Sequence, residues 1–196
     1  FPYVNGGMFH DQDIIIPPFT EEMKDILLNK ASRGFDWSEI SPTIFGAVFE
    51  STLNPETRRQ GGMHYTSVEN IHKVIDPLFL DKLKHELQEI KDKYTQPRSL
   101  ANHAQEFQDK LSKLTFLDPA CGSGNFLTET YLSLRRLENE AISIATQGAS
   151  VLETGDKADK YIKVSIQQFY GIEINDFAVS VAKTALWIAE DQMMKE

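Results

Sequence analysis

Residues 114–127 constrain the fold of this chain more than any other part of its sequence. They read Leu-Thr-Phe-Leu-Asp-Pro-Ala-Cys-Gly-Ser-Gly-Asn-Phe-Leu. The apolar residues 114–117 predict a short strand that ends at Asp118-Pro119, because proline cannot donate a hydrogen bond to a neighbouring strand. A glycine loop and a long helical pattern follow. This order predicts a nucleotide-type pocket at the carboxyl edge of a parallel sheet, with glycines allowing close approach of a ligand.

Residues 117–127 also resemble motif I of class I S-adenosylmethionine-dependent methyltransferases. The form Asp-Pro-x-x-Gly-x-Gly-x-Phe is typical of those that methylate amino groups in DNA. The resemblance implies that S-adenosylmethionine is the cofactor and that the loop surrounds its methionine part through Asp118, Pro119, Ala120, Gly122, Gly124 and Phe126. The alternative is an ordinary strand-to-helix turn that binds nothing.

A second strand–helix unit supports the first. Residues 169–174 predict a short buried strand, and Asn175 or Asp176 can cap a helix with apolar residues at helical spacing. Glu173 would then lie at the strand end, where a carboxylate can accept hydrogen bonds from both ribose hydroxyls. Residues 169–176 resemble motif II of the same family, which implies Glu173 on the ribose and Ile174 against the adenine. The alternative for Glu173 is a solvated carboxylate.

The spacing argues against a nicotinamide or flavin site. Glu173 lies much further from Gly124 than the roughly 20 residues expected in a dinucleotide fold. Leu127 also occupies the position of the third glycine of that fingerprint. Neither departure conflicts with a methyltransferase, in which the intervening helix can be long.

A third motif lies upstream, at residues 61–67, which read Gly-Gly-Met-His-Tyr-Thr-Ser. Thr66 and Glu69 form a capping-box pattern for the following helix. The segment resembles motif X of amino-methyltransferases, which implies that Tyr65 and Thr66 close over the methionine end of the cofactor. The alternative is a capped helix with a flexible entry. Together with residues 2–9 and 41–50, these motifs resemble type IIG and type ISP restriction–modification enzymes.

The residues that such chemistry needs are missing from the chain. Amino-methylating DNA enzymes hold the target amine and the flipped base with an Asn/Asp/Ser-Pro-Pro-Tyr/Phe loop after motif I. Residues 16–19, Ile-Pro-Pro-Phe, lack the polar acceptor and precede motif I. Cys121 is a small spacer in the glycine loop rather than a nucleophile. We therefore predict no catalytic residue, and the five histidines show no spacing typical of a metal site.

Composition limits the partners. The net charge of −9 and the pI near 5.1 argue against this chain as the main surface that grips DNA, since phosphate binding needs clustered Lys and Arg. A single cysteine excludes an internal disulfide, and no apolar run is long enough to cross a membrane. We expect a cytoplasmic location, no membrane partner, and DNA binding through a longer parent protein.

These observations predict an α/β protein with an all-α N-terminal region. Residues 1–113 form a helical region that carries the motif X loop at 61–67. Residues 114–196 form the first half of a Rossmann-like class I methyltransferase sheet, with motif I at 117–127 and motif II at 169–176. Half a sheet leaves an unpaired edge, so a homodimer or a domain-swapped assembly is consistent with the sequence.

The expected function is methyl transfer from S-adenosylmethionine to the N6 amine of adenine in a restriction–modification system. This chain would supply the cofactor-binding part and would be inactive alone. Cytosine N4 methylation is the alternative target, because the loop that distinguishes the two is absent. A non-catalytic helical interaction module is the alternative function.

Overall fold

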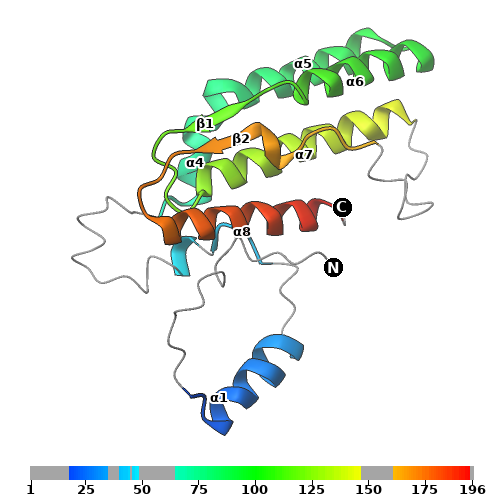
Figure 1. Ribbon diagram of the computed structural model, residues 1–196. Helices are drawn as coiled ribbons and strands as arrows, with labels where there is room; N and C mark the ends of the chain where they lie inside the picture. The colour runs from blue at the N-terminus through cyan, green and yellow to red at the C-terminus, as the bar shows by residue number, and fades with distance from the viewer. Residues whose placement is uncertain (1–17, 35–39, 45, 49–64, 147–160, 195–196) are drawn as a thin grey trace.

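The computed structural model describes residues 18–34, 40–44, 46–48, 65–146 and 161–194 (Figure 1). This part of the chain is mostly helical, with one small parallel sheet of two strands. Residues 61–64 of the predicted motif X loop and residues 147–160 lie outside these ranges. Within the ranges, no helix is both long and apolar enough to cross a membrane.

The central element is helix α7, Asn125–Ala145, which packs against three other helices and both strands. Its helical neighbours are α4 (Val68–Ile75), α6 (Pro97–Leu111) and α8 (Asp176–Met193). In Figure 1, α5 (Asp81–Lys93) and α6 lie on one side of α7, and α8 lies on the other. The long helix predicted after the glycine loop is therefore the scaffold on which the other elements assemble.

Helices α4 and α5 form one continuous helical run. A π-helical turn, η2 (Asp76–Leu80), joins them. Proline inside a helix removes a backbone donor and usually breaks or kinks the helix. Here the wider π-helical turn accommodates Pro77 without ending the helical run.

The start of α4 differs from the predicted capping box by one residue. The N-cap is Ser67, whose hydroxyl accepts a hydrogen bond from the Asn70 N–H at 3.4 Å, so Thr66 lies before the cap. Of the apolar residues spaced along α4 and η2, only some are buried. Ile71 and Ile75 are buried, whereas Val74 and Leu78 are exposed.

The two strands pair in parallel, as the sequence predicts. Strand β1 (Phe116–Asp118) aligns with β2 (Phe169–Gly171), and Asp118 lies opposite Gly171. Both are shorter than predicted: β1 begins two residues later, and β2 ends three residues earlier. One reason is that the Leu114 carbonyl accepts a hydrogen bond from the Gln168 side chain at 2.7 Å instead of entering the ladder.

The two faces of the sheet differ. On one face, Phe116 stacks on Phe169 with ring centroids 5.3 Å apart, and Tyr131 of α7 meets Phe169 edge-on at 5.6 Å. On the other face, Leu117 and Tyr170 are 63% and 55% exposed. Helices thus cover only one side of the sheet in the described part of the chain.

In the described residues before α4, the chain forms helix at two places. Helix α1 (Glu21–Asp25), capped by the Thr20 hydroxyl, continues into the π-helical η1 (Ile26–Arg33). Neither contains a buried residue, and α1 lies apart from the other helices in Figure 1. Residues 44 and 46–48 are helical and are called the Gly46 helix below.

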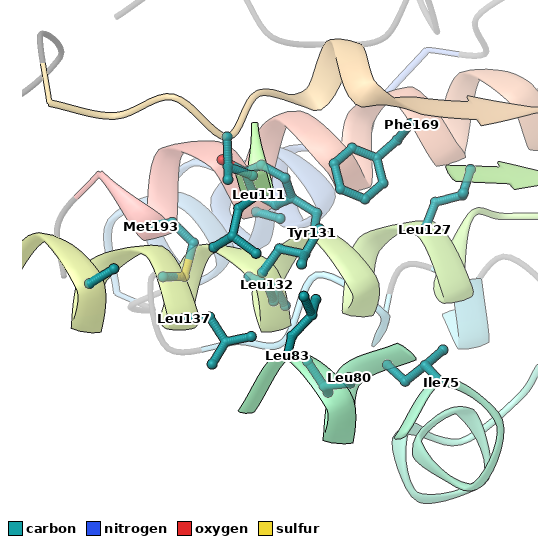
Figure 2. Close-up of a cluster of buried hydrophobic side chains, with 14 of the residues drawn as sticks. Ile75, Leu80, Leu83, Leu111, Leu127, Tyr131, Leu132, Leu137, Phe169 and Met193 are labelled. Atoms are coloured by element: carbon teal, nitrogen blue, oxygen red, sulfur yellow. The ribbon is translucent and has the colours of Figure 1, made fainter. Parts of the chain in front are cut away.

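The hydrophobic core joins the helical elements to the sheet. Figure 2 shows Leu80 and Leu83 on one side of α7, with Phe169 of β2 on the other. The same cluster includes Leu111 of α6 and Met193 of α8. Residues on both sides of position 113 therefore contribute to one core.

A buried ion pair lies within this core. The Arg135 guanidinium donates to the Glu138 carboxylate one turn along α7, and both side chains are almost fully buried. Glu138 Oε1 also accepts hydrogen bonds from the Gln108 side chain and from the backbone N–H groups of Lys163 and Val164. This carboxylate thus connects α6, α7 and the segment that leads into β2.

We expect Glu138→Ala to lower the free energy of unfolding by about 3–5 kcal/mol, because it leaves a buried guanidinium without a counter-charge. Glu140→Ala is the matched control. Glu140 pairs with Lys91 at 2.8 Å, but the pair is exposed, so the loss should stay below about 1 kcal/mol. Urea unfolding of the 196-residue chain measures both. Equal losses would show that the buried pair does not stabilise the fold.

A histidine links α4 to α7. His72 Nδ1 lies 2.8 Å from Asp76 Oδ1, and Nε2 lies 3.1 Å from Glu129 Oε1. Carboxylates only accept hydrogen bonds, so both nitrogens can donate only when the ring is protonated. The hydrogen bond to Asp76, followed by that to Glu129, raises the pKa of His72 despite its partial burial. Arg136 and Lys84 lie within 4 Å of the two carboxylates, Arg136 near Glu129 and Lys84 near Asp76.

This link should weaken as the pH rises. The pKa of His72 is higher in the folded state than its unfolded value of about 6.5. Protonation of His72 therefore stabilises the fold fully at pH values below about 6.5, and this stabilisation is lost as the pH rises through the folded-state pKa. We expect the free energy of unfolding of the wild type to exceed that of His72→Gln at pH 6, and the difference to shrink by pH 9. Urea unfolding at both values is the measurement. A difference independent of pH would contradict the charged link.

Candidate functional site

The carboxyl ends of β1 and β2 lie side by side. Beyond the strands, the Ile172 N–H donates to the Asp118 carbonyl at 2.9 Å, and the Cys121 N–H donates to the Ile172 carbonyl at 3.0 Å. These bonds carry the pairing past Gly171 into both loops. The loop of residues 119–124, called the glycine loop below, is thereby held against the segment that follows β2.

Glu173 makes the second connection between the two loops. Its Oε2 accepts a hydrogen bond from the Gly122 N–H at 3.0 Å. Its Oε1 accepts the N–H groups of Ile174 and Asn175 at 2.7 and 2.8 Å. A carboxylate offers about four acceptor positions, so three are used and one remains, on Oε2. In this arrangement Glu173 can accept one further hydroxyl, and a contact to two hydroxyls requires one backbone N–H to be released.

The two glycines of the loop serve different purposes. Gly122 has φ +53°, and a β-carbon there would meet nothing within 4 Å. Gly124 has φ +80°, and a β-carbon there would lie 2.8 Å from the Ala182 β-carbon of α8. Gly122 therefore gives an open backbone surface, whereas Gly124 lets α8 pack closely against the start of α7.

The other predicted loop residues occupy three kinds of position. Asp118 turns its carboxylate toward the loop, and Oδ1 accepts the Ala120 N–H at 3.0 Å. Pro119 and Ala120 are exposed beside it. Phe126 is half-buried and packs against the hydrophobic core. The loop thus presents backbone and small side chains to solvent, while Phe126 anchors it from behind.

Ile174 is the most exposed large apolar residue in the described part of the chain, at 97%. It adjoins Glu173 and precedes Asn175, whose side chain caps α8 by accepting the Ala178 N–H at 2.9 Å. Because its side chain is almost fully exposed, Ile174 adds no apolar burial to the stability of the folded chain. Its exposure leaves it available to a ligand.

Tyr65 and Thr66 come just before α4, and the structure does not bring them to the loop through polar contacts. Among the described residues, no hydrogen bond or ion pair joins either of them to the glycine loop or to Glu173. Tyr65 is 37% exposed. The helix they precede is nevertheless tied to the first turns of α7 through His72 and Glu129.

Cys121 points toward the strands. A β-carbon at Gly171 would lie 2.6 Å from Cys121 Sγ, so the glycine makes room for the thiol. Burial, followed by the negative charges of Asp118 and Glu173, raises the pKa of Cys121 to about 11. The thiol is therefore protonated at neutral pH, and a protonated thiol is a poor nucleophile.

The motif patterns did not reveal several residues that support this site. Gly171 accommodates Cys121, Ala182 packs against Gly124, and Gly46 lies against the far side of the loop. A glycine within a helical apolar stripe was the one available signal for Gly46, since glycine is unfavourable there. In the ranges that the structure describes, no cluster of three or more His, Cys, Asp or Glu side chains could hold a metal ion.

Comparisons with known proteins add to this geometry. Residues 88–196 match the family model of the MmeI DNA-methyltransferase domain. The chain is 42% identical to DNA methyltransferase A of Bacillus subtilis (strain 168), over its whole length and 21% of that protein. It is 29% identical over 77 residues to the adenine-specific methyltransferase PglX of Streptomyces coelicolor, covering 39% of this chain and 6% of PglX.

A solved structure agrees with these matches. The type IIL restriction–modification enzyme MmeI, in complex with DNA, aligns with a TM-score of 0.76 and 42% identity, covering 98% of this chain. The chain spans 24% of that structure and about a fifth of the Bacillus relative. Because the family match extends over more than half of its residues, the chain belongs to the MmeI DNA-methyltransferase domain family.

Proposed function

We propose that the chain forms the S-adenosylmethionine-binding part of a DNA methyltransferase with a Rossmann-like sheet. Two parallel strands separated by a helix, with a glycine loop after the first, support this proposal. In this proposal residues 114–196 carry the cofactor site, and residues 1–113 form a helical region that carries the loop at 61–67. The activity belongs to the full-length natural protein.

The single observation that carries the proposal is the surface formed by Gly122, Glu173 and Ile174. Gly122 has open space on its side-chain face, Glu173 has one acceptor position left, and Ile174 is almost fully exposed. A nucleoside requires an acceptor for a ribose hydroxyl and an apolar surface for its base. These three residues, from the two adjoining strand ends, provide both.

We assign the remaining contacts by their place in the motifs. Asp118, Pro119, Ala120 and Gly124 shape the loop around the methionine part, and Phe126 fixes its position from the core. Tyr65 and Thr66 would close over the methionine end of the cofactor. Bound S-adenosylmethionine supplies the activated methyl group. The residues of this chain hold and orient it, since positioning is the main contribution of a protein to such a transfer.

The target is proposed to be the N6 amine of adenine in DNA. The name of the PglX relative supports adenine, and the DNA in the MmeI structure supports a DNA partner. Cytosine N4 is the alternative, because the target-binding loop is absent from this chain. The net charge of −9 argues against this chain contributing most of the phosphate contacts, so we place DNA binding mainly on other parts of the protein.

The uncovered face of the sheet favours a second candidate, an interaction module. Leu117 and Tyr170 expose apolar surface that a partner, including a second copy of the chain, can cover. Sedimentation equilibrium of the wild type and of Leu117→Lys distinguishes the two candidates. A dimer that the substitution dissociates supports the module, and a monomer at all concentrations opposes it.

We expect Ile174→Ala to weaken binding of S-adenosylmethionine without changing stability. Loss of the apolar contact should cost about 1–2 kcal/mol, or roughly five- to thirtyfold in affinity. Since the side chain is 97% exposed, the free energy of unfolding should change by no more than about 0.5 kcal/mol. Calorimetric titration of the full-length natural protein measures the affinity.

Leu28→Ala is the matched control for that titration, because Leu28 is an aliphatic residue 62% exposed on η1. The Leu28→Ala variant should bind the cofactor with the same affinity as the wild type. If Ile174→Ala binds S-adenosylmethionine as tightly as the wild type, the proposed contact between Ile174 and the adenine base is wrong. Failure of the folded wild type to bind would contradict the proposed function itself.

We expect DNA treated with the full-length natural protein and S-adenosylmethionine to contain N6-methyladenine. Mass spectrometry of the digested DNA identifies the methylated nucleoside. Glu173→Ala protein should give none above background, because the carboxylate both holds the Gly122 N–H and faces the proposed ribose. N4-methylcytosine in place of N6-methyladenine would overturn the target but not the reaction.

A further inference from the structure

Gly46 lies far from the glycine loop in sequence, yet its backbone contacts residues at the end of that loop. A β-carbon at Gly46 would stand 2.4 Å from Ser123 Oγ and 2.6 Å from Asn125 Oδ1. Ordinary van der Waals contacts of a β-carbon begin near 3.4 Å. Position 46 therefore accepts only a residue without a side chain, unless Ser123 and Asn125 move.

Backbone conformation does not explain this glycine. Among the glycines that the structure describes, only Gly122 and Gly124 have positive φ. Within a helix, glycine is less favourable than alanine, because it loses more conformational freedom on folding. The Gly46 helix itself would thus be stabilised by alanine, and its approach to the loop is the remaining physical reason for glycine.

The Gly46 helix is held in place by α8. The Gln192 side chain near the end of α8 donates to the Ile40 carbonyl at 2.9 Å, and Pro42 and Thr43 are buried. The same helix α8 contacts the loop directly, where Ala182 meets Gly124. The end of the glycine loop is therefore enclosed between α8 and the Gly46 helix.

Asn125 has little freedom to move away from an added methyl group. It is the first residue of α7 and its exposure is 7%, so the surrounding packing leaves its side chain little space to enter. Displacing a buried side chain from its preferred rotamer costs free energy. Here the displaced side chain is that of Asn125, the residue that directly follows Gly124. The disturbance would reach the loop backbone that donates to Glu173.

We propose that Gly46 is a positioning residue for the cofactor loop: its missing side chain allows the Gly46 helix to fix Ser123 and Asn125, and through them the geometry of the loop. This inference rests on the proposed function. It assigns a role in cofactor binding to a segment nearly 80 residues upstream of the loop.

Gly46→Ala in the full-length natural protein tests the proposal. We expect the affinity for S-adenosylmethionine to fall about tenfold, the cost of one displaced side chain. The KM for S-adenosylmethionine should rise more than kcat falls, because the substitution disturbs cofactor binding rather than the target amine. Without cofactor, the backbone amide NMR signals of Gly122 and Gly124 should shift, while those of α6 should not.

Two further variants separate positioning from loss of folding. Ser123→Ala, added to Gly46→Ala, removes the atom nearest to the new methyl group and should restore part of the affinity. Ile44→Ala, on the same helix but 42% exposed, should bind like the wild type. Wild-type affinity and unshifted loop signals in Gly46→Ala would overturn the proposal, as would a loss that Ser123→Ala does not reduce. If the wild type binds no S-adenosylmethionine, the proposed function fails, whereas the NMR signals still test the contact.

Discussion

The hydrogen bond from the Gly122 N–H to Glu173 Oε2 is the interaction on which the site depends. It joins two loops that follow different strands, and it does so where a glycine backbone with positive φ faces open space. Because the same carboxylate holds the N–H groups of Ile174 and Asn175, one side chain sets the position of the loop, the exposed isoleucine and the cap of α8. Three used acceptor positions leave one for a ligand, so the geometry of Glu173 limits how a ribose can bind.

Helix α7 turns this local link into a stable one. This helix lies between the two strands in the sequence. It buries charged groups at two places along its length: Glu129 near its start, and the Arg135–Glu138 pair in its middle. Charged groups buried in this way are costly unless every partner is in place, so the helices around α7 are held in one arrangement. The loop is therefore built on a rigid element, as a binding site for a small molecule requires.

The sequence predicts the parts of the fold that depend on local signals. Pro119 and the glycines locate the loop, Asn175 caps α8 as expected, and the apolar spacing after Asn175 identifies the buried face of α8. What it misses depends on contacts between distant segments. The Gln168 side chain takes the Leu114 carbonyl out of the ladder, Pro77 is absorbed by a π-helical turn, and the proximity of Gly46 to Asn125 has no local signature. The order of the motifs in the sequence identified Glu173 as a candidate site residue. Only the structure shows that its carboxylate already accepts hydrogen bonds from three backbone N–H groups.

The most direct test is an NMR titration of the isotope-labelled, full-length natural protein with S-adenosylhomocysteine. If the two strand ends form the cofactor site, the backbone amide signals of Gly122, Ile174 and Asn175 should shift together and saturate with one affinity. Signals from the hollow between α5 and α6, which is lined by Tyr94 and His103, should stay in place. Shifts confined to that hollow, or unchanged Gly122 and Ile174 signals at saturation, would contradict the site.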